Sequence, residues 1–147
     1  MNKRWHALSP LIVVSLGVFL LSGASEAAVT TFQLEMSGDQ EVPPGDPDGK
    51  ASGTLSIDDS ANSVSWNIAY SGFREPQAMH IHAGKAGVAG GPVVPLNVGT
   101  SEEGKLIGTA SADAKTIAAI LAAPADYYVN IHTAEFRPGA VRGQLAK

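Results

Sequence analysis

The feature that most constrains the fold is a strict alternation of apolar and polar residues in several short segments. Residues 63–70 show it most clearly, because Val64, Trp66, Ile68 and Tyr70 alternate with small or polar residues. Side chains two positions apart lie on the same face of a β-strand, so this pattern is typical of a strand with one face in the core. The segment therefore predicts a half-buried strand.

Similar segments recur along the chain and are separated by turn-forming residues. They predict further strands at residues 31–37, 51–57, 78–83, 105–110, 127–132 and 140–145. The polar run at residues 58–62 (DDSAN) predicts a hairpin between the second and third strands. Residues 41–50 predict a loop. The stretch rich in Gly and Pro at residues 86–95 predicts an irregular loop with a short apolar end.

One segment departs from the alternation. In residues 111–123 (SADAKTIAAILAA), apolar residues stand at helical spacing after a capping residue, either Ser111 or Asp113, and Pro124 follows. This predicts one short helix. Seven or eight short strands with a single helix predict an all-β fold. The fold class is an antiparallel Greek-key or immunoglobulin-like β-sandwich, or a barrel.

The first 27 residues have the features of a secretory signal peptide. Lys3 and Arg4 precede a short apolar run at residues 11–21, and small residues lead up to Ala27. The run is shorter than the roughly 20 apolar residues of a membrane span. We therefore expect cleavage near Ala27, a mature domain of residues 28–147, a secreted or periplasmic location and no membrane attachment afterwards.

The charge and the lack of cysteine exclude several functions. Without Lys3, Arg4 and Glu26, the 10 basic and 14 acidic residues fall to 8 and 13, a net charge of −5. Nucleic acids and anionic membranes need a basic surface, so neither is an expected partner. The chain contains no cysteine. This excludes disulfides, thiol catalysis, thiolate zinc sites and blue-copper ligation.

The three histidines of the mature chain fall in two predicted strands. His80 and His82 are two residues apart, so both point to one face of their strand, and His132 ends another. Three imidazoles from two neighbouring strands can hold one metal ion, and imidazole suits copper and zinc. The sequence therefore predicts a copper or zinc site at His80, His82 and His132. No other cofactor and no catalytic residue is predicted.

Other interpretations of the same residues stay open. The histidines can instead pack and hydrogen-bond to the backbone without any metal. Glu41, Glu75 and Glu135 are possible fourth ligands, whereas Met79 points to the opposite face of its strand. Arg137 and Arg142 are candidate anion-binding residues. The residues thus have three possible roles, as metal ligands, as structural histidines and, for the two arginines, as guides for an anionic substrate.

Five ordered motifs resemble the CHRD (chordin) domain family. They are residues 39–44 (DQEVPP), 51–54 (ASGT), 78–82 (AMHIH), 127–133 (YYVNIHT) and 138–145 (PGAVRGQL). The resemblance covers about residues 31–145 and implies an immunoglobulin-like or barrel-like β-domain. The family is named for repeats in chordin, an extracellular antagonist of growth factors. Similar single domains occur in exported bacterial proteins, so the resemblance does not imply growth-factor binding here.

The H-x-H pair with a later V-x-I-H strand is also similar to the copper ligands of copper-zinc superoxide dismutases. The bridging histidine, the fourth histidine and the disulfide of those enzymes are missing here. Three functions follow as hypotheses. The first is an exported, non-enzymatic metal-binding domain for storage, delivery or tolerance. The second is a structural or protein-interaction module without metal. The third is a copper-dependent redox enzyme.

Overall fold

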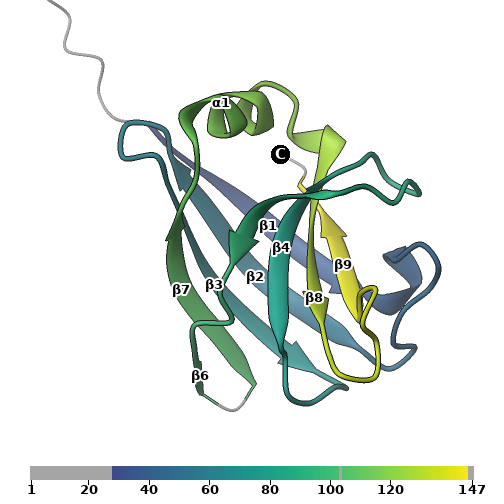
Figure 1. Ribbon diagram of the computed structural model, residues 1–147. Coiled ribbons are helices and arrows are strands. Elements are labelled where there is room, and N and C mark those ends of the chain that lie inside the picture. Colours follow the sequence, from purple (N-terminus) through teal and green to yellow (C-terminus); the bar gives the residue numbers. More distant parts are fainter. Residues whose placement is uncertain (1–27, 103, 146–147) are drawn as a thin grey trace, which may run out of the picture.

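The computed structural model describes residues 28–102 and 104–145 (Figure 1). The predicted signal peptide, residues 1–27, lies outside the described residues and stays a prediction. The described part of the chain forms nine strands, one α-helix and two 3-10 turns. In order these are β1 (Val29–Ser37), η1 (Gly38–Gln40), β2 (Lys50–Asp58), β3 (Ser63–Ser71), β4 (Ala78–Ala83), β5 (Pro92–Leu96), β6 (Thr100–Glu102), β7 (Lys105–Ser111), α1 (Ala114–Ala122), η2 (Pro124–Asp126), β8 (Tyr127–His132) and β9 (Val141–Gln144).

The strands form one antiparallel sheet that curls into a nearly closed barrel. The order of strands is β5-β4-β8-β9-β1-β2-β3-β7-β6, and β5 lies against β7 across the gap. Around that part of the barrel the order is therefore β3, β7, β5, β4, which is a Greek-key arrangement. Figure 1 shows β4, β8 and β9 on one side and β1, β2, β3 and β7 on the other. The predicted all-β antiparallel fold with one short helix is confirmed.

Strand register places the C-terminal strand at a junction of the barrel. The hairpin predicted between β2 and β3 is present, with Asp58 opposite Ser63. At the other end of the chain, Arg142 of β9 pairs with Asn130 of β8 on one side and with Ser37 of β1 on the other. The backbone of β9 thereby connects the two sides of the barrel.

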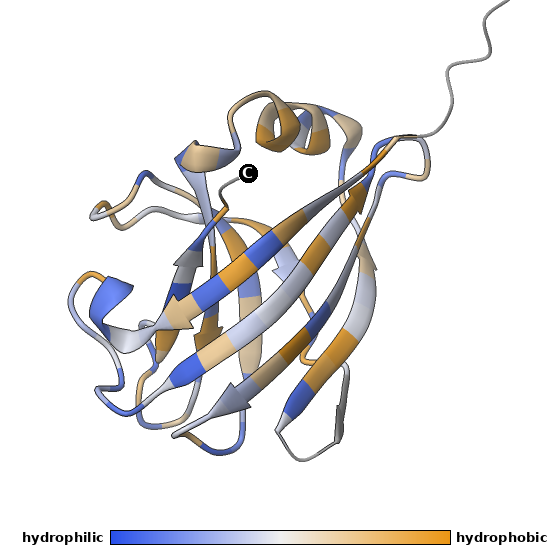
Figure 2. Cartoon of the chain, turned by 180° about the vertical axis from the view of Figure 1, so that it is seen from behind, coloured by the Kyte–Doolittle hydropathy of each residue, from blue (hydrophilic) through white to orange (hydrophobic). Residues whose placement is uncertain are grey.

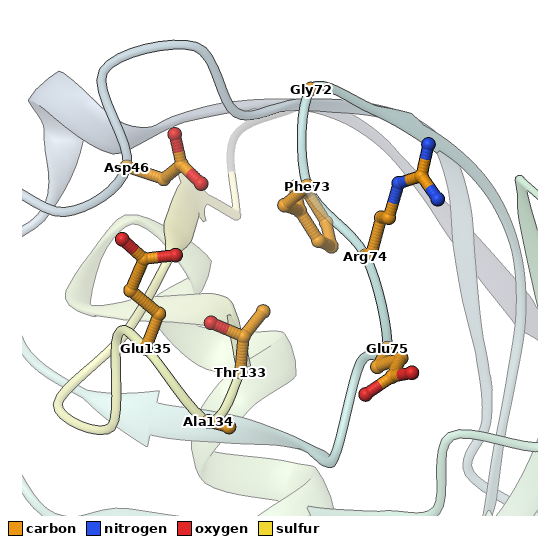
Figure 3. Close-up of a pocket in the computed structure, with 8 residues that line it drawn as sticks. All are labelled: Asp46, Gly72, Phe73, Arg74, Glu75, Thr133, Ala134 and Glu135. Carbon is orange, nitrogen blue, oxygen red and sulfur yellow. The ribbon is translucent and has the colours of Figure 1, made fainter.

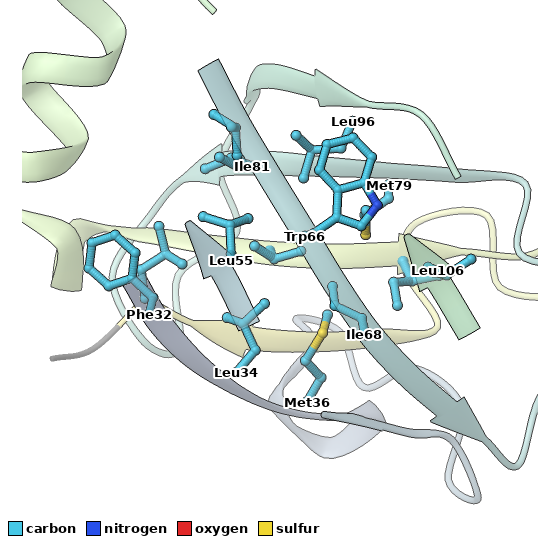
Figure 4. Packing of buried hydrophobic residues seen from close by; sticks show 14 of the residues in the cluster. Phe32, Leu34, Met36, Leu55, Trp66, Ile68, Met79, Ile81, Leu96 and Leu106 are labelled. Atoms are coloured by element: carbon cyan, nitrogen blue, oxygen red, sulfur yellow. The ribbon is translucent and has the colours of Figure 1, made fainter. Parts of the chain in front are cut away.

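The core lies inside the barrel and follows the alternation of the sequence. Val64, Trp66 and Ile68 are buried, as predicted. Figure 2 shows the alternating hydrophobic and hydrophilic bands along the strands seen from behind. Figure 4 shows that side chains from both sides of the barrel meet in one cluster, which includes Phe32, Leu34, Met36, Leu55, Trp66, Ile68, Met79, Ile81, Leu96 and Leu106. Burial of these apolar surfaces supplies most of the driving force for folding.

Helix α1 lies over one end of the barrel (Figure 1). It begins after Asp113, whose carboxylate accepts hydrogen bonds from the backbone N–H groups of Lys115 and Thr116. Ile117 and Ile120 are buried against the core. Asp113 is therefore the capping residue, and Ser111 belongs to β7. Within the described residues, we find no helix with the length and apolar character needed to span a membrane.

The expectation of an irregular loop over residues 86–95 is wrong for its last part, which forms β5. Pro92 and Pro95 masked this strand, because proline has no backbone N–H and is uncommon within sheets. The strand pairs with β4 on only one side, at the end of the sheet, where missing N–H groups are tolerated. β6 was also missed, since three residues are too few to show a period.

Truncating a side chain that points into the core should cost more stability than truncating one on the outer surface. Leu34 is fully buried, whereas Ile107 on the outer surface is 42% exposed. We expect Leu34→Ala to lower the free energy of unfolding by about 2–5 kcal/mol, because it removes buried methyl groups and leaves a cavity. Ile107→Ala should cost less than about 1 kcal/mol. Urea unfolding followed by tryptophan fluorescence measures both. Equal losses in the two variants would contradict this description of the core.

Candidate metal centre

The three predicted histidines meet on the outer face of β4 and β8. His80 and His82 point outward, while Met79 and Ile81 between and beside them are fully buried in the core. His80 lies opposite Asn130 of β8, two residues from His132. One ring nitrogen from each histidine lies within 4.8 Å of the other two, and His80 Nδ1 is 3.0 Å from His132 Nε2. The structure therefore brings the three residues together.

Backbone carbonyls set the tautomers of two of the rings. His82 Nδ1–H donates to the carbonyl of Gly90 at 2.8 Å, and His132 Nδ1–H donates to the carbonyl of Arg137 at 2.8 Å. A carbonyl oxygen only accepts, so Nδ1 must carry the proton in both rings. Each ring is left with a lone pair on Nε2. In metal sites, such outer bonds orient the ligand and fix the nitrogen that binds.

The two Nε2 atoms have different surroundings. His132 Nε2 accepts the hydrogen bond from His80 Nδ1. His82 Nε2 is buried and has no hydrogen-bond partner among the described residues. A buried polar atom without a partner costs folding free energy and calls for an explanation such as an ion or a water. The lone pair of His82 is therefore available to a ligand.

The surroundings of His80 and His82 favour the neutral form of both rings. Burial lowers the pKa of His80, and the nearby His132 and His82 lower it further. Burial is also the main cause of the lowered pKa of His82, and Arg142 contributes to it, while the hydrogen bond to Gly90 acts in the opposite direction. Only a neutral imidazole has a free lone pair, so a lowered pKa favours metal binding over protonation.

A buried arginine lies behind His82. Arg142 is 1% exposed, and its guanidinium lies 3.4 Å from the centre of the Tyr128 ring. Tyr128 in turn stacks on His82, with ring centres 4.9 Å apart and an angle of 19° between the planes. The three side chains form a continuous stack of cation and aromatic rings. Because the stack is buried, it limits how far the His82 ring can turn.

The same arginine holds the loop that carries the partner of His82. Its N–H groups donate to the carbonyl oxygens of Val88 at 2.9 Å and Lys85 at 2.8 Å. Both carbonyls belong to residues 84–91, which connect β4 to β5 and are called here the 84–91 loop. Gly90 in this loop exchanges hydrogen bonds with the hydroxyl of Tyr128 at 3.2 and 3.3 Å. The loop position that fixes the His82 tautomer is therefore fixed by the stack.

This geometry does not fit the expected role of Arg142 as an anion guide. Its N–H groups are used by loop carbonyls and by Gln144 Oε1, at 3.1 Å, and the side chain is almost fully buried. Arg137 is exposed, but its contribution to the site is its backbone carbonyl, which accepts from His132. Arg142 therefore supports His82 through its side chain, whereas Arg137 orients His132 through its backbone carbonyl.

The carboxyl of Glu41 is buried on the same outer face and forms no ion pair with any residue that the structure describes. It is 6% exposed, and its Oε1 has no hydrogen-bond partner within the described chain. A side chain at Gly139 would collide with this carboxyl, so the glycine leaves the space that Glu41 fills. Burial raises the pKa of Glu41, and nearby Asn130 and Arg142 only partly oppose this effect.

The other two candidate ligands line a separate hollow. Glu75 and Glu135 lie around a cavity of about 390 Å³ together with Asp46, Arg74 and Phe73 (Figure 3). None of the eight residues that line this cavity is a histidine. In Figure 3 the carboxylates of Asp46 and Glu135 lie on one side of it and Glu75 on the other. The structure thus separates Glu75 and Glu135 from the group formed by the three histidines.

Comparison with known families agrees with the resemblance found in the sequence. The family model of the CHRD domain matches residues 32–145. The chain belongs to the CHRD domain family. Neither the curated proteins nor the solved structures contain a match to it. The matched region of this CHRD domain includes all three histidines, Glu41, Asn130 and Arg142.

The clamp by Arg142 can be tested with a conservative change. We expect Arg142→Lys to lower the free energy of unfolding by about 2–4 kcal/mol, because an ammonium cannot bridge two carbonyls and stack on a ring at once. Amide hydrogen exchange should also become faster within the 84–91 loop. The exposed Arg137→Lys is the matched control and should change neither quantity. Normal exchange in the 84–91 loop of Arg142→Lys would refute the clamp.

The buried carboxyl of Glu41 predicts a specific pH dependence. Its pKa is raised above 4.5 in the folded state, so the folded protein binds this proton more tightly than the unfolded chain does. The contribution to stability is present at low pH and is lost as the pH rises through the raised value. We therefore expect Glu41→Gln to gain stability relative to the wild type as the pH rises from 4 to 8.

Urea unfolding at several pH values measures this difference. The exposed Glu135→Gln removes the same charge from a neighbouring loop and serves as the control, with a nearly constant difference from the wild type. A difference for Glu41→Gln that does not change with pH would mean that burial does not disfavour the ionised carboxylate.

Proposed function

We propose that this CHRD domain binds one copper or zinc ion through His80, His82 and His132. The observation that carries the proposal is the convergence of three ring nitrogens within 4.8 Å, two of them in rings whose tautomer is set by a carbonyl. Neutral imidazoles are suitable ligands for both metals. No thiolate is available, and the histidine group contains no carboxylate.

Binding requires a small rearrangement of the rings. Bonds of about 2.0–2.1 Å to one centre place ligand nitrogens roughly 3–4 Å apart. His80 Nδ1 and His132 Nε2 are already 3.0 Å apart, but the proton between them must leave before both can bind the ion. The ring of His80 can carry its proton on Nε2 instead. Metal binding is therefore expected to replace the His80–His132 hydrogen bond and to depend on pH.

We further propose that the domain acts outside the cytosol. The support is the amino-terminal sequence, which has the charge, the short apolar run and the small residues of a signal peptide. A three-histidine site in an exported domain suits metal storage, delivery or tolerance. A redox enzyme with copper is a further hypothesis, and redox assays become informative once copper binding is established.

The alternative is a structural or protein-interaction module without metal. The observation that favours it is the set of hydrogen bonds that the histidines make with one another and with the loops. In that case the three rings connect β4, β8 and the covering loops, and the function depends on a protein partner. Metal binding separates the two proposals, because a purely structural histidine has no reason to bind an ion tightly.

We expect the purified, metal-free protein to bind one equivalent of Cu(II) or Zn(II). His80→Ala, His82→Ala and His132→Ala should each weaken binding by roughly 100-fold or more, because each removes one ligand. Calorimetric titration and elemental analysis measure affinity and stoichiometry. The bound ion should also raise the midpoint of thermal unfolding.

Asn67→Ala, on the exposed surface of β3, is the control and should bind like the wild type. Variants that are less stable but bind metal as the wild type does would refute the site. The absence of tight binding in the wild type would favour the interaction module.

A further inference from the structure

Three buried polar atoms on the outer face of the barrel share one unusual property. Glu41 Oε1, Asn130 Oδ1 and His82 Nε2 are all buried, and none has a hydrogen-bond partner in the described part of the chain. Their residues are 6%, 1% and 8% exposed. Only four side-chain atoms of the described residues are in this state, and the fourth, Trp66 Nε1, lies in the core.

Asn130 lies between the other two residues. Its side chain approaches the Glu41 carboxyl and the His82 ring closely enough for hydrogen bonding to lower the pKa of Glu41 and to raise that of His82. These contacts are too long or too bent to satisfy Glu41 Oε1, Asn130 Oδ1 and His82 Nε2, which therefore stay without a partner among the described residues. On β8 Asn130 stands directly opposite His80, in the register pairing of β4 with β8. His82 is therefore the buried member of the histidine group, whereas His80 and His132 are partly exposed, and Asn130 links His82 to the Glu41 carboxyl.

The chemistry of the three atoms is complementary to one kind of ligand. His82 Nε2 offers a lone pair, because its ring carries the proton on Nδ1. The amide oxygen of Asn130 and the carboxyl oxygen of Glu41 accept hydrogen bonds. A metal ion satisfies the imidazole, and a water on that ion has two hydrogens to donate. One hydrated metal ion can therefore satisfy all three atoms.

We propose that the ion held by the three histidines keeps a fourth coordination position, which binds a water molecule that donates hydrogen bonds to Asn130 and Glu41. This inference rests on the proposed function, because it describes the open position of that same metal. Three protein ligands and one water are typical of metal sites that perform chemistry, whereas sites with a structural role have four protein ligands. The site is then open and selects ligands.

The selectivity follows from the two acceptors. Water donates hydrogen bonds and is favoured at this position. Small anions without a proton, such as azide, have only hydrogen-bond acceptors. At this position their acceptors would face the acceptor oxygens of Asn130 and Glu41, so no hydrogen bond could form and their binding is disfavoured. Replacing Glu41 by glutamine supplies an N–H donor of the same shape and removes the carboxylate. The variant should therefore accept azide more readily than the wild type does.

The experiment is an azide titration of the Cu(II)-loaded protein at about pH 7.5, close to neutrality. The azide-to-copper charge-transfer band measures how much azide is bound. We expect Glu41→Gln to bind azide about tenfold more tightly than the wild type. Glu135→Gln removes an exposed carboxylate from the neighbouring loop and should leave azide affinity unchanged. In the wild type without azide, electron-nuclear double resonance should show exchangeable protons on a copper-bound water.

The outcomes separate this inference from the proposed function. If Cu(II) binds through the three histidines but Glu41→Gln has wild-type azide affinity, or if no exchangeable water protons are seen, the water site is refuted and the metal site stands. If neither Cu(II) nor Zn(II) binds tightly, the metal site itself is refuted, and the water site with it. Glu41→Gln is nearly isosteric, and its circular dichroism spectrum checks that it folds.

Discussion

The arrangement of the site depends on one buried arginine. The backbone of Arg142 joins β9 to β8 and to β1, and its guanidinium holds the 84–91 loop and stacks on Tyr128. Removing such a charge from water is costly, and the cost is offset only because the cation has carbonyl oxygens and an aromatic face around it. The guanidinium shares this work with Tyr128 and Gln144, whose side chains hydrogen-bond to Gly90 and Gly84 of the same loop.

Backbone carbonyls of two covering loops orient two of the histidines. The 84–91 loop presents the Gly90 carbonyl to His82, and the 133–140 loop presents the Arg137 carbonyl to His132. At Gly90 a side chain would collide with the carbonyl of Ala83, so the loop can approach the sheet only with glycine there. The chain has no disulfide to rigidify these loops. Their positions therefore depend on hydrogen bonds from buried side chains.

Much of the fold could be predicted from the sequence, because period-two alternation directly reports which side chains face the core. The segments at residues 78–83 and 127–132 coincide with β4 and β8, and the position of His80 and His82 on one face of their strand followed from their spacing. The covering loops could not be predicted in this way. Arg142 was expected to be a candidate anion-binding residue, and only the position of a loop far away in the sequence shows that it is buried.

The same non-local cover explains why Asn130 and Glu41 were not assigned a joint role. Spacing alone places Asn130 beside His132, but whether an outward residue is wet or buried depends on residues 84–91 and 133–140. Once the loops close over it, each unpartnered oxygen becomes a cost to stability that a well-packed core would avoid. Local conflicts of this kind are expected where a protein binds something, and here they gather beside three imidazoles. The buried polar atoms therefore give a second reason, besides the histidines, to regard this face as a binding site.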